Sequence, residues 1–131
     1  IDATISNNFV LHNTLWLPAH FHTYNAMGNV LFSLGFFHWF AHKFDVGFNI
    51  DKNAMLKLTL ILFGGIGFLL AFYIGGADSI PRRYSNYPPE FTMAAPLATV
   101  AAVFATFYLL AILLFFLNIT KKCIKIMSST S

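Results

Sequence analysis

Three long apolar segments restrict the fold of this chain more than any other feature of its sequence. They cover Leu15–Ala41, Ala54–Gly75 and Thr92–Ile119. Each has the roughly 20 mainly apolar residues that a helix needs to cross a hydrocarbon core about 30 Å thick. The chain is also 57% hydrophobic and only 10% charged, which is unlike a soluble globular domain. We therefore predict an all-α integral membrane fold with three transmembrane helices.

The helix boundaries follow from the polar residues and prolines around these segments. Asn13 or Thr14 can cap the first helix, and Pro18 is tolerated because it lies in the first turn. The Ser- and Thr-rich end of the chain has too little apolar surface to pack, so we expect it to be disordered. The expected helices cover about 14–42, 54–75 and 92–119, the outer loop 76–91 and the disordered tail 127–131, all within one unit, 1–131.

The first residues and the single cysteine exclude some possibilities. The N-terminal residues lack the basic start and apolar core of a signal peptide, and the chain begins with Ile1. We expect a processed, split or partial piece of a longer protein. Cys123, as the only cysteine, excludes an internal disulfide and a thiolate metal cluster. It is expected to be an ordinary residue at a membrane exit, with lipidation as the minor alternative.

Basic residues gather at one end of the predicted bundle. Six of the eight lysines and arginines flank the first interhelical loop or follow the third helix. By the positive-inside rule that side is cytoplasmic, or the matrix side in a mitochondrion. Arg82 and Arg83 are the exceptions, because they lie in the outer loop. The sequence has no basic stripe with interleaved polar residues, so we expect no nucleic-acid partner. The six basic residues on the predicted cytoplasmic or matrix side are Lys43, Lys52, Lys57, Lys121, Lys122 and Lys125.

His20 and His22 lie near the outer end of the first predicted helix. Residues at i and i+2 of a helix point about 200° apart, so the two imidazoles reach opposite sides. That spacing does not favour one chelated ion, but it suits two large planar ligands, one on each flank. In a membrane helix, haems are ligands of that size. The alternative is that both histidines only bond carbonyl groups of adjacent helices, and the spacing alone does not separate the two.

Arg82 and Arg83 supply an independent test of the haem interpretation. Haems beside the outer end of the first helix would project their propionates toward the outer surface. Guanidinium groups stay charged and bind carboxylates bidentately, so they are suited to neutralise these anions. The alternative is a pair of arginines that reach lipid headgroups. Together the histidine pair and the arginine pair favour a haem site, because each predicts the position of the other.

The remaining polar residues carry weaker signals. His12 with Asn13 could hold a hard cation or a propionate, although capping of the helix by Asn13 is the default. His38 and His42 are expected at the inner membrane interface. The sequence shows no serine or cysteine nucleophile arrangement, phosphate loop or paired carboxylate site. Surface charges of the outer loop are expected at Asp78 and Glu90.

Two stretches of the sequence together resemble one known family. The first is His12-Asn13-Thr14-Leu15-Trp16-Leu17-Pro18-Ala19-His20-Phe21-His22, and the second, about sixty residues later, is Pro81-Arg82-Arg83-Tyr84. This combination is similar to subunit I of the haem-copper terminal oxidases, and the likeness runs from about Asn8 to Ile119. The resemblance implies that the chain forms the last three helices of a larger, twelve-helix-type bundle.

The resemblance also implies roles for single residues. His20 would be the proximal ligand of the high-spin haem at the oxygen-reducing centre, and His22 one of two axial ligands of the low-spin haem. Phe21 would lie on the short route between two haems of A type, and Arg82 and Arg83 would bind their propionates. The implied activity is a terminal oxidase that reduces O₂ to water with proton translocation, with cytochrome c, a copper protein or a quinol as donor.

One position departs from the family's common mitochondrial pattern. There, the residue after His12 is an aspartate and the pair helps to bind a magnesium ion; here it is Asn13, which leaves magnesium open. His12-Asn13-Thr14 and the Ala94-Ala95-Pro96 entry to the last helix look more like the archaeal and divergent bacterial branch. We therefore expect a prokaryotic plasma membrane, with the mitochondrial inner membrane as the alternative.

The resemblance covers only part of the catalytic machinery. The family's copper-binding histidines, cross-linked tyrosine and second low-spin haem ligand belong to earlier helices that this sequence does not contain. Activity would therefore require the N-terminal part of subunit I, with subunit II and other oxidase subunits, in a lipid membrane. A rival hypothesis is a non-catalytic, electron-carrying membrane subunit of the bis-histidine cytochrome kind. A helical hairpin that binds nothing is the third.

Overall fold

The computed structural model describes residues 10–43 and 52–129, and within them it leaves the side chains of 41–42, 122–123, 125–127 and 129 undescribed. The expectations for Cys123, His42, Lys122 and Lys125 therefore lie outside the described side chains. Every element of the described part is a helix, so the all-α class is confirmed there. The order is α2 (Trp16–His22), the π-helix η1 (Thr23–Asn29), α3 (Val30–Lys43), α4 (Lys52–Ala77) and α5 (Ala94–Ser129).

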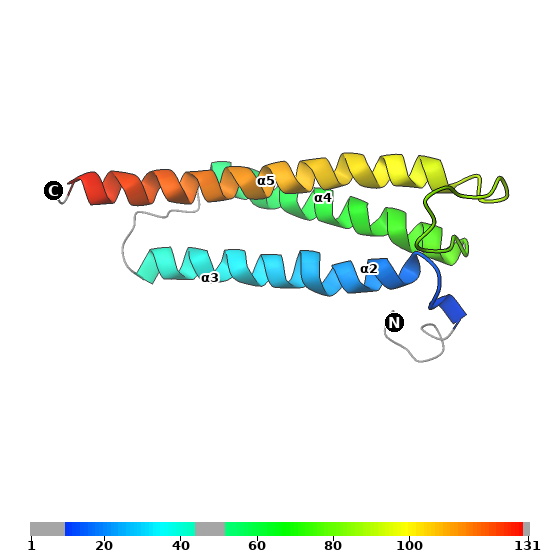
Figure 1. The fold of residues 1–131 in the computed structure, drawn as a ribbon. Helices are drawn as coiled ribbons and strands as arrows, with labels where there is room; N and C mark the ends of the chain where they lie inside the picture. Colours follow the sequence, from blue (N-terminus) through cyan, green and yellow to red (C-terminus); the bar gives the residue numbers. More distant parts are fainter. Residues whose placement is uncertain (1–9, 44–51, 130–131) are drawn as a thin grey trace.

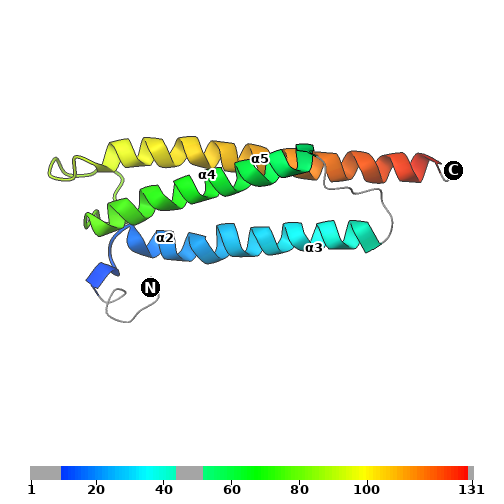
Figure 2. The same cartoon turned by 180° about the vertical axis from the view of Figure 1, so that it is seen from behind.

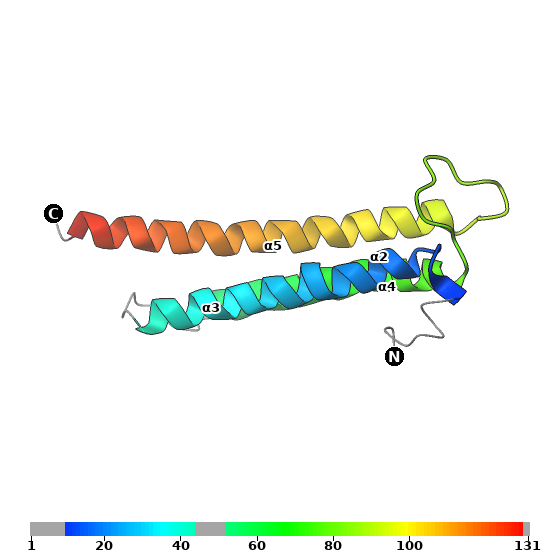
Figure 3. The same ribbon diagram turned by 60° about the horizontal axis from the view of Figure 1, so that its bottom comes forward.

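The helices form three rods that run side by side (Figure 1). The first rod is α2, η1 and α3 in succession, and α4 runs back beside it before α5 returns. Figure 2 shows the same order from behind, and in Figure 3 the first rod overlies α4 while α5 runs alongside them. The start of α2, the end of α4 and the loop before α5 therefore share one end of the bundle. The described lysines, Lys43, Lys52, Lys57 and Lys121, belong to the parts of the helices toward the other end.

Thr14 fixes the start of the first rod. Its hydroxyl donates a hydrogen bond to the Leu11 carbonyl at 2.9 Å and accepts one from the Trp16 N–H at 3.2 Å. This caps a backbone amide that the first turn of the helix leaves without a partner. The helix begins at Trp16 rather than near residue 14: Leu15 is its N-cap residue, and Thr14, one residue earlier, bonds the Trp16 amide from outside the helix.

The last helix extends further than the sequence predicts. α5 continues to Ser129 instead of ending near Ile119, and residues 127–129 of the expected disordered tail are helical. The sequence contains no proline or glycine after Pro96, so nothing in it interrupts the helix.

Two helices of the described part are long and apolar enough to cross a membrane: α4, and α5 as far as Lys121. The expected first span is divided by η1, so neither of its α-helical pieces alone reaches that length. A third crossing stays a prediction. Large apolar side chains of α5, such as Leu109 (62% exposed) and Leu113 (54% exposed), face outward, which suits lipid or further helices better than water.

Small residues on α4 allow the rods to approach closely. A Cβ at Gly64 would lie 2.7 Å from the backbone nitrogen of Tyr108 on α5, so a larger residue does not fit there without moving a helix. One buried cluster surrounds this crossing and includes Met27, Ile61 and Tyr108. A second cluster lies toward the end that carries the outer loop and is built around Ile80 and Leu97.

Candidate functional site

His20 and His22 both lie on α2, in different surroundings. The ring of His22 faces α4, with centroids 5.4 Å from Phe68 and 6.1 Å from Phe72. The ring of His20 lies 5.0 Å from Tyr24, one turn further along its own rod. Both histidines are partly buried. The two imidazoles therefore do not converge on one point, which agrees with the divergence that their spacing predicts.

Phe21 lies between the two histidines and is 60% exposed. Its ring contacts His22 edge to face, with centroids 5.6 Å apart. An exposed phenylalanine next to two partly buried imidazoles leaves an apolar surface that neither α4 nor α5 covers. This surface is available to a large apolar ligand or to helices outside this chain.

The outer loop is attached to the start of the histidine-bearing rod by backbone hydrogen bonds. The Leu15 N–H donates to the Ile80 carbonyl at 2.9 Å, and the Arg82 N–H donates to the Asn13 carbonyl at 3.0 Å. Thr14 and Pro81 form the isolated antiparallel bridge between these bonds. Residues 13–15 and 80–82 thus lie side by side, although more than sixty residues separate them in the chain. The structure brings the arginine pair to the end of the molecule that carries His20 and His22.

The end of α4 directs the chain into this pairing. The Ile80 N–H donates to the Gly75 carbonyl at 2.9 Å, and the Ser79 N–H donates to the Gly76 carbonyl at 3.1 Å. These two bonds, with Ser79 at φ 58°, form a Schellman motif that ends the helix. Ile80 follows it and is fully buried, so it anchors the loop just before Pro81.

Arg82 and Arg83 have different environments. Arg82 is partly buried and its backbone is fixed by the bond to Asn13, whereas Arg83 is exposed and has φ 70°. A non-glycine residue in this left-handed region costs of order 1–3 kcal/mol, so the surrounding loop contacts must stabilise it. Among residues 10–43 and 52–129, neither guanidinium forms an ion pair with a carboxylate. Both charges are available to an anion from outside this part of the chain.

Aromatic and hydroxyl contacts fix α2 against α4. The rings of Trp16 and Tyr73 meet edge to face with centroids 4.8 Å apart. The Tyr73 and Thr23 hydroxyls are hydrogen-bonded at 2.9 Å, and the Thr23 hydroxyl is also 2.9 Å from the Ala19 carbonyl. A Cβ at Gly76 would lie 2.6 Å from Trp16 Cα, so glycine is needed for the two backbones to approach this closely.

The indole nitrogen of Trp16 is buried and has no hydrogen-bond partner within the described part of the chain. A buried N–H donor without an acceptor costs about 1–3 kcal/mol. Trp16 is one turn before His20 and two residues after Thr14, which pairs with the arginine loop. An acceptor supplied by a ligand or by another helix at this end would remove that cost.

His12 and Asn13 precede this site, and both are exposed. The Asn13 carbonyl is used by the backbone of Arg82. Across residues 10–43 and 52–129, no three His, Cys, Asp or Glu side chains gather in a way that would hold a metal ion. Asp78 and Glu90 of the outer loop are exposed as well.

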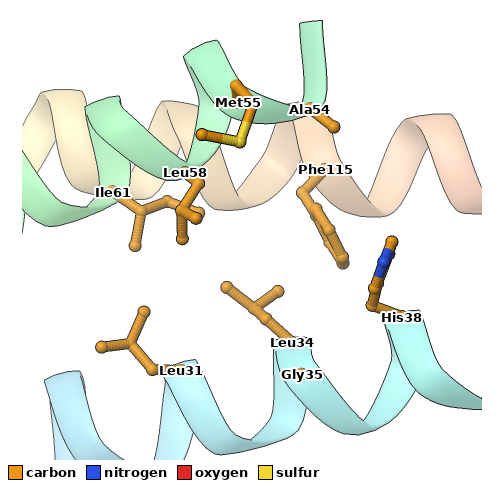
Figure 4. Close-up of a pocket in the computed structure, with 9 residues that line it drawn as sticks. All are labelled: Leu31, Leu34, Gly35, His38, Ala54, Met55, Leu58, Ile61 and Phe115. Carbon is orange, nitrogen blue, oxygen red and sulfur yellow. The ribbon is translucent and has the colours of Figure 1, made fainter. Parts of the chain in front are cut away.

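His38 belongs to a separate place near the other end of the bundle. It lines an apolar cavity of about 220 Å³ between α3, α4 and α5, together with Leu34, Met55 and Phe115 (Figure 4). Lys43 lies one turn further on, and its ammonium is 5.1 Å from the ring of Trp39. A lysine and a tryptophan at this end are typical of a membrane interface, where the sequence predicts His38. The cavity is remote from the arginine loop.

Sequence reasoning missed η1 and the two tyrosines that contact it. The Tyr108 hydroxyl donates to the Ala26 carbonyl, inside η1, and the Tyr73 hydroxyl bonds Thr23 at its start. One available signal is the set of polar residues within an otherwise apolar run, Thr23, Asn25 and Asn29. Such side chains compete for backbone groups and often accompany irregular helix turns.

These features define a class: a helical membrane protein in which one end of the bundle gathers two diverging imidazoles, two arginines and a buried indole donor. The particular family follows from its sequence relatives. The family model for cytochrome c and quinol oxidase polypeptide I matches residues 1–112. The chain belongs to this family of integral membrane proteins, and the resemblance inferred from its histidine and arginine motifs is confirmed.

Individual relatives match most of this chain but little of their own length. Cytochrome c oxidase polypeptide 1 of Halobacterium salinarum is 35% identical over 103 residues, which cover 76% of this chain and 17% of the relative. Cytochrome bo(3) ubiquinol oxidase subunit 1 of Buchnera aphidicola is 35% identical over 122 residues, 88% of this chain and 18% of the relative. Cytochrome c oxidase subunit 1 of Thermus thermophilus is 27% identical over 121 residues, which cover 89% of this chain and 22% of the relative.

The chain thus spans about a fifth of the length of these curated relatives. No solved structure matches it. The relatives named here include archaeal and bacterial proteins, and their names give both cytochrome c and ubiquinol as donors.

Proposed function

We propose that this chain is the C-terminal three-helix part of the catalytic subunit of a respiratory terminal oxidase. The whole enzyme would reduce O₂ to water and couple the reaction to proton translocation. Within it, His20 binds the iron of the high-spin haem and His22 the iron of the low-spin haem. Arg82 and Arg83 bind the haem propionates, and Phe21 lies on the route between the two haems.

The backbone pairing of residues 13–15 with 80–82 carries this proposal. It attaches the arginine-bearing loop to the start of the helix that holds both histidines. Two arginines at the same end of the bundle as two imidazoles are suited to a ligand with a nitrogen-binding metal centre and anionic substituents, which describes a haem. A pair of arginines that only reached lipid headgroups would not need this attachment to α2.

The environment of the site also fits haem. The buried Trp16 N–H is a donor in need of an acceptor, and the two guanidinium groups form no ion pair with carboxylates of the described chain. The imidazole of His22 is bordered by Phe68 and Phe72, which keep water from one side of it. We infer that the apolar surface around Phe21 is covered by haem edges and by helices outside this chain.

The haems, and a copper ion held by residues outside this chain, would supply the electron transfer and the oxygen chemistry. The residues of this chain supply binding and charge compensation. The imidazoles of His20 and His22, which diverge from one short helix, would each hold one iron. Arg82 and Arg83 offset the propionate charges, which would otherwise be costly near the hydrocarbon core.

We include no magnesium ion in the proposal. Asn13 replaces the carboxylate that the common family pattern uses, and an amide is a weaker ligand for a hard cation. The partners of this chain would be the N-terminal part of subunit I, subunit II and further oxidase subunits in the lipid membrane. The archaeal and bacterial relatives favour a prokaryotic plasma membrane over the mitochondrial inner membrane.

The test is an optical spectrum of the intact complex, reduced with and without carbon monoxide, together with metal analysis. The proposal predicts two haems, one that binds carbon monoxide and one that does not, and copper in the same preparation. A complex with low-spin haem alone and no copper would refute the oxidase and support the bis-histidine cytochrome alternative. Pyridine extraction of the haems would show whether they are of A type.

A further inference from the structure

The rod that carries His20 and His22 changes its helical geometry immediately after His22. η1 begins at Thr23 and ends at Asn29, where α-helical geometry resumes. A π turn closes hydrogen bonds from i to i+5 instead of i to i+4, so it accommodates an additional residue. Since one residue of an α-helix corresponds to a rotation of about 100°, η1 rotates α2 relative to α3 by an amount of that order. It therefore sets the direction in which α2 presents its imidazoles.

π-Helical turns are rare, and this one is stabilised by side chains. Some of them come from the same rod: the Asn25 amide donates to the Phe21 carbonyl at 3.0 Å, and the Asn29 amide donates to Asn25 at 3.2 Å. These contacts lie on the exposed side of the helix. On the side that faces the other helices, η1 meets two tyrosines, Tyr73 from α4 and Tyr108 from α5.

Tyr108 is the more rigidly placed of these contacts. It is 8% exposed, and its backbone lies against Gly64, where an added Cβ would be 2.7 Å from the Tyr108 nitrogen. Its ring lies beside Gly65, with 3.3 Å from an added Cβ to the nearest ring carbon. Its hydroxyl donates to the Ala26 carbonyl in the middle of η1. A buried hydroxyl that lost this acceptor would be left unsatisfied, so the bond favours the π register over a regular α turn.

We propose that Tyr108 is a positioning residue for the histidine pair: its hydroxyl holds the π turn at Ala26, and thereby the orientation of His20 and His22 about the helix axis. This inference rests on the proposed function, because it concerns how the imidazoles meet their irons. Groups that orient a metal ligand tune the metal without touching it. The orientation of an axial imidazole plane alters the splitting of the iron d orbitals, so it can be read from the haem spectrum.

The experiment uses the intact oxidase with Tyr108→Phe, which removes the hydroxyl and keeps the ring. The expected result is parental haem content, with shifted electron paramagnetic resonance g values and a shifted midpoint potential of the low-spin haem. The matched control is Thr106→Val, also on α5. It removes a hydroxyl that bonds the Ala102 carbonyl of its own helix at 2.8 Å, so it leaves both quantities at parental values. Parental values in Tyr108→Phe overturn the inference.

A second variant decides the case in which Tyr108→Phe does not assemble. Replacement of Tyr108 by 4-fluorophenylalanine keeps the ring and fills the place of the hydroxyl but cannot donate a hydrogen bond to the Ala26 carbonyl, so a shift of the same g values is expected. Parental g values in that variant overturn the inference. If His20→Ala and His22→Ala each lose their haem signal while both Tyr108 variants are parental, only the inference fails; if the histidine variants keep both signals, the proposed function fails.

Discussion

Replacement of Gly76 by alanine tests the close contact on which the site depends. The new Cβ would lie 2.6 Å from Trp16 Cα and 2.7 Å from Trp16 Cβ. Non-bonded carbon atoms pack at about 3.5–4.0 Å, so α4 and the start of α2 would have to separate by roughly 1 Å. Overpacking of this kind costs about 1–3 kcal/mol. The separation would also stretch the bonds that join residues 13–15 to 80–82, which are 2.9 and 3.0 Å long.

The assay is thermal inactivation of the intact oxidase in detergent, with haem absorbance as the readout. Gly76→Ala should lower the apparent melting temperature and release haem earlier than the parent. The matched control is Gly35→Ala on α3, where, among the described residues, no heavy atom outside the adjoining backbone of the same helix lies within 4 Å of the added Cβ. Alanine favours a helix over glycine by about 1 kcal/mol, so this control should be as stable as the parent or more stable. A Gly76→Ala protein as stable as the control would refute the reasoning.

Two further substitutions test neighbouring parts of the site. Thr14→Ala removes the cap of the Trp16 amide and should lower the free energy of unfolding by about 0.5–2 kcal/mol in chemical denaturation; an unchanged value would contradict the role of Thr14 as the cap. Arg82→Gln removes a positive charge next to the proposed propionates. Loss of this charge stabilises the oxidised iron relative to the reduced iron, so the midpoint potential of the affected haem should fall in a redox titration. Lys121→Gln, at the other end of the bundle, is the control, and equal potentials in the two variants would argue against propionate binding by Arg82.

The helical class and the approximate positions of the helices could be predicted because membrane helices need long apolar runs, and these are visible in the sequence. The residues at which the helices end were less predictable. α4 ends in a Schellman motif whose left-handed residue is Ser79, where glycine is the usual signal. α5 runs on to Ser129 because helix continuation depends on the absence of a breaker rather than on the end of the apolar stretch.

The approach of the arginine loop to the histidine helix could be anticipated because two independent residue pairs pointed to one ligand. The atomic basis of this approach could not be anticipated, because a backbone pairing of residues 13–15 with 80–82 has no local sequence signal. The π-helix was also missed, because a helical period of 3.6 was assumed across the whole first segment. Its stabilising partner, Tyr108, lies 82 residues from Ala26, beyond the range of any local pattern.

The spectra of two histidine variants of the intact oxidase test the central claim most directly. His22→Ala should lose the low-spin haem signal and retain high-spin haem that binds carbon monoxide. His20→Ala should do the reverse, with low-spin haem retained and the carbon monoxide difference spectrum lost. His38→Ala, on the same rod but at the remote cavity, should match the parent. If His20→Ala and His22→Ala both gave the parental spectrum, the assignment of one haem to each flank of this helix would be wrong.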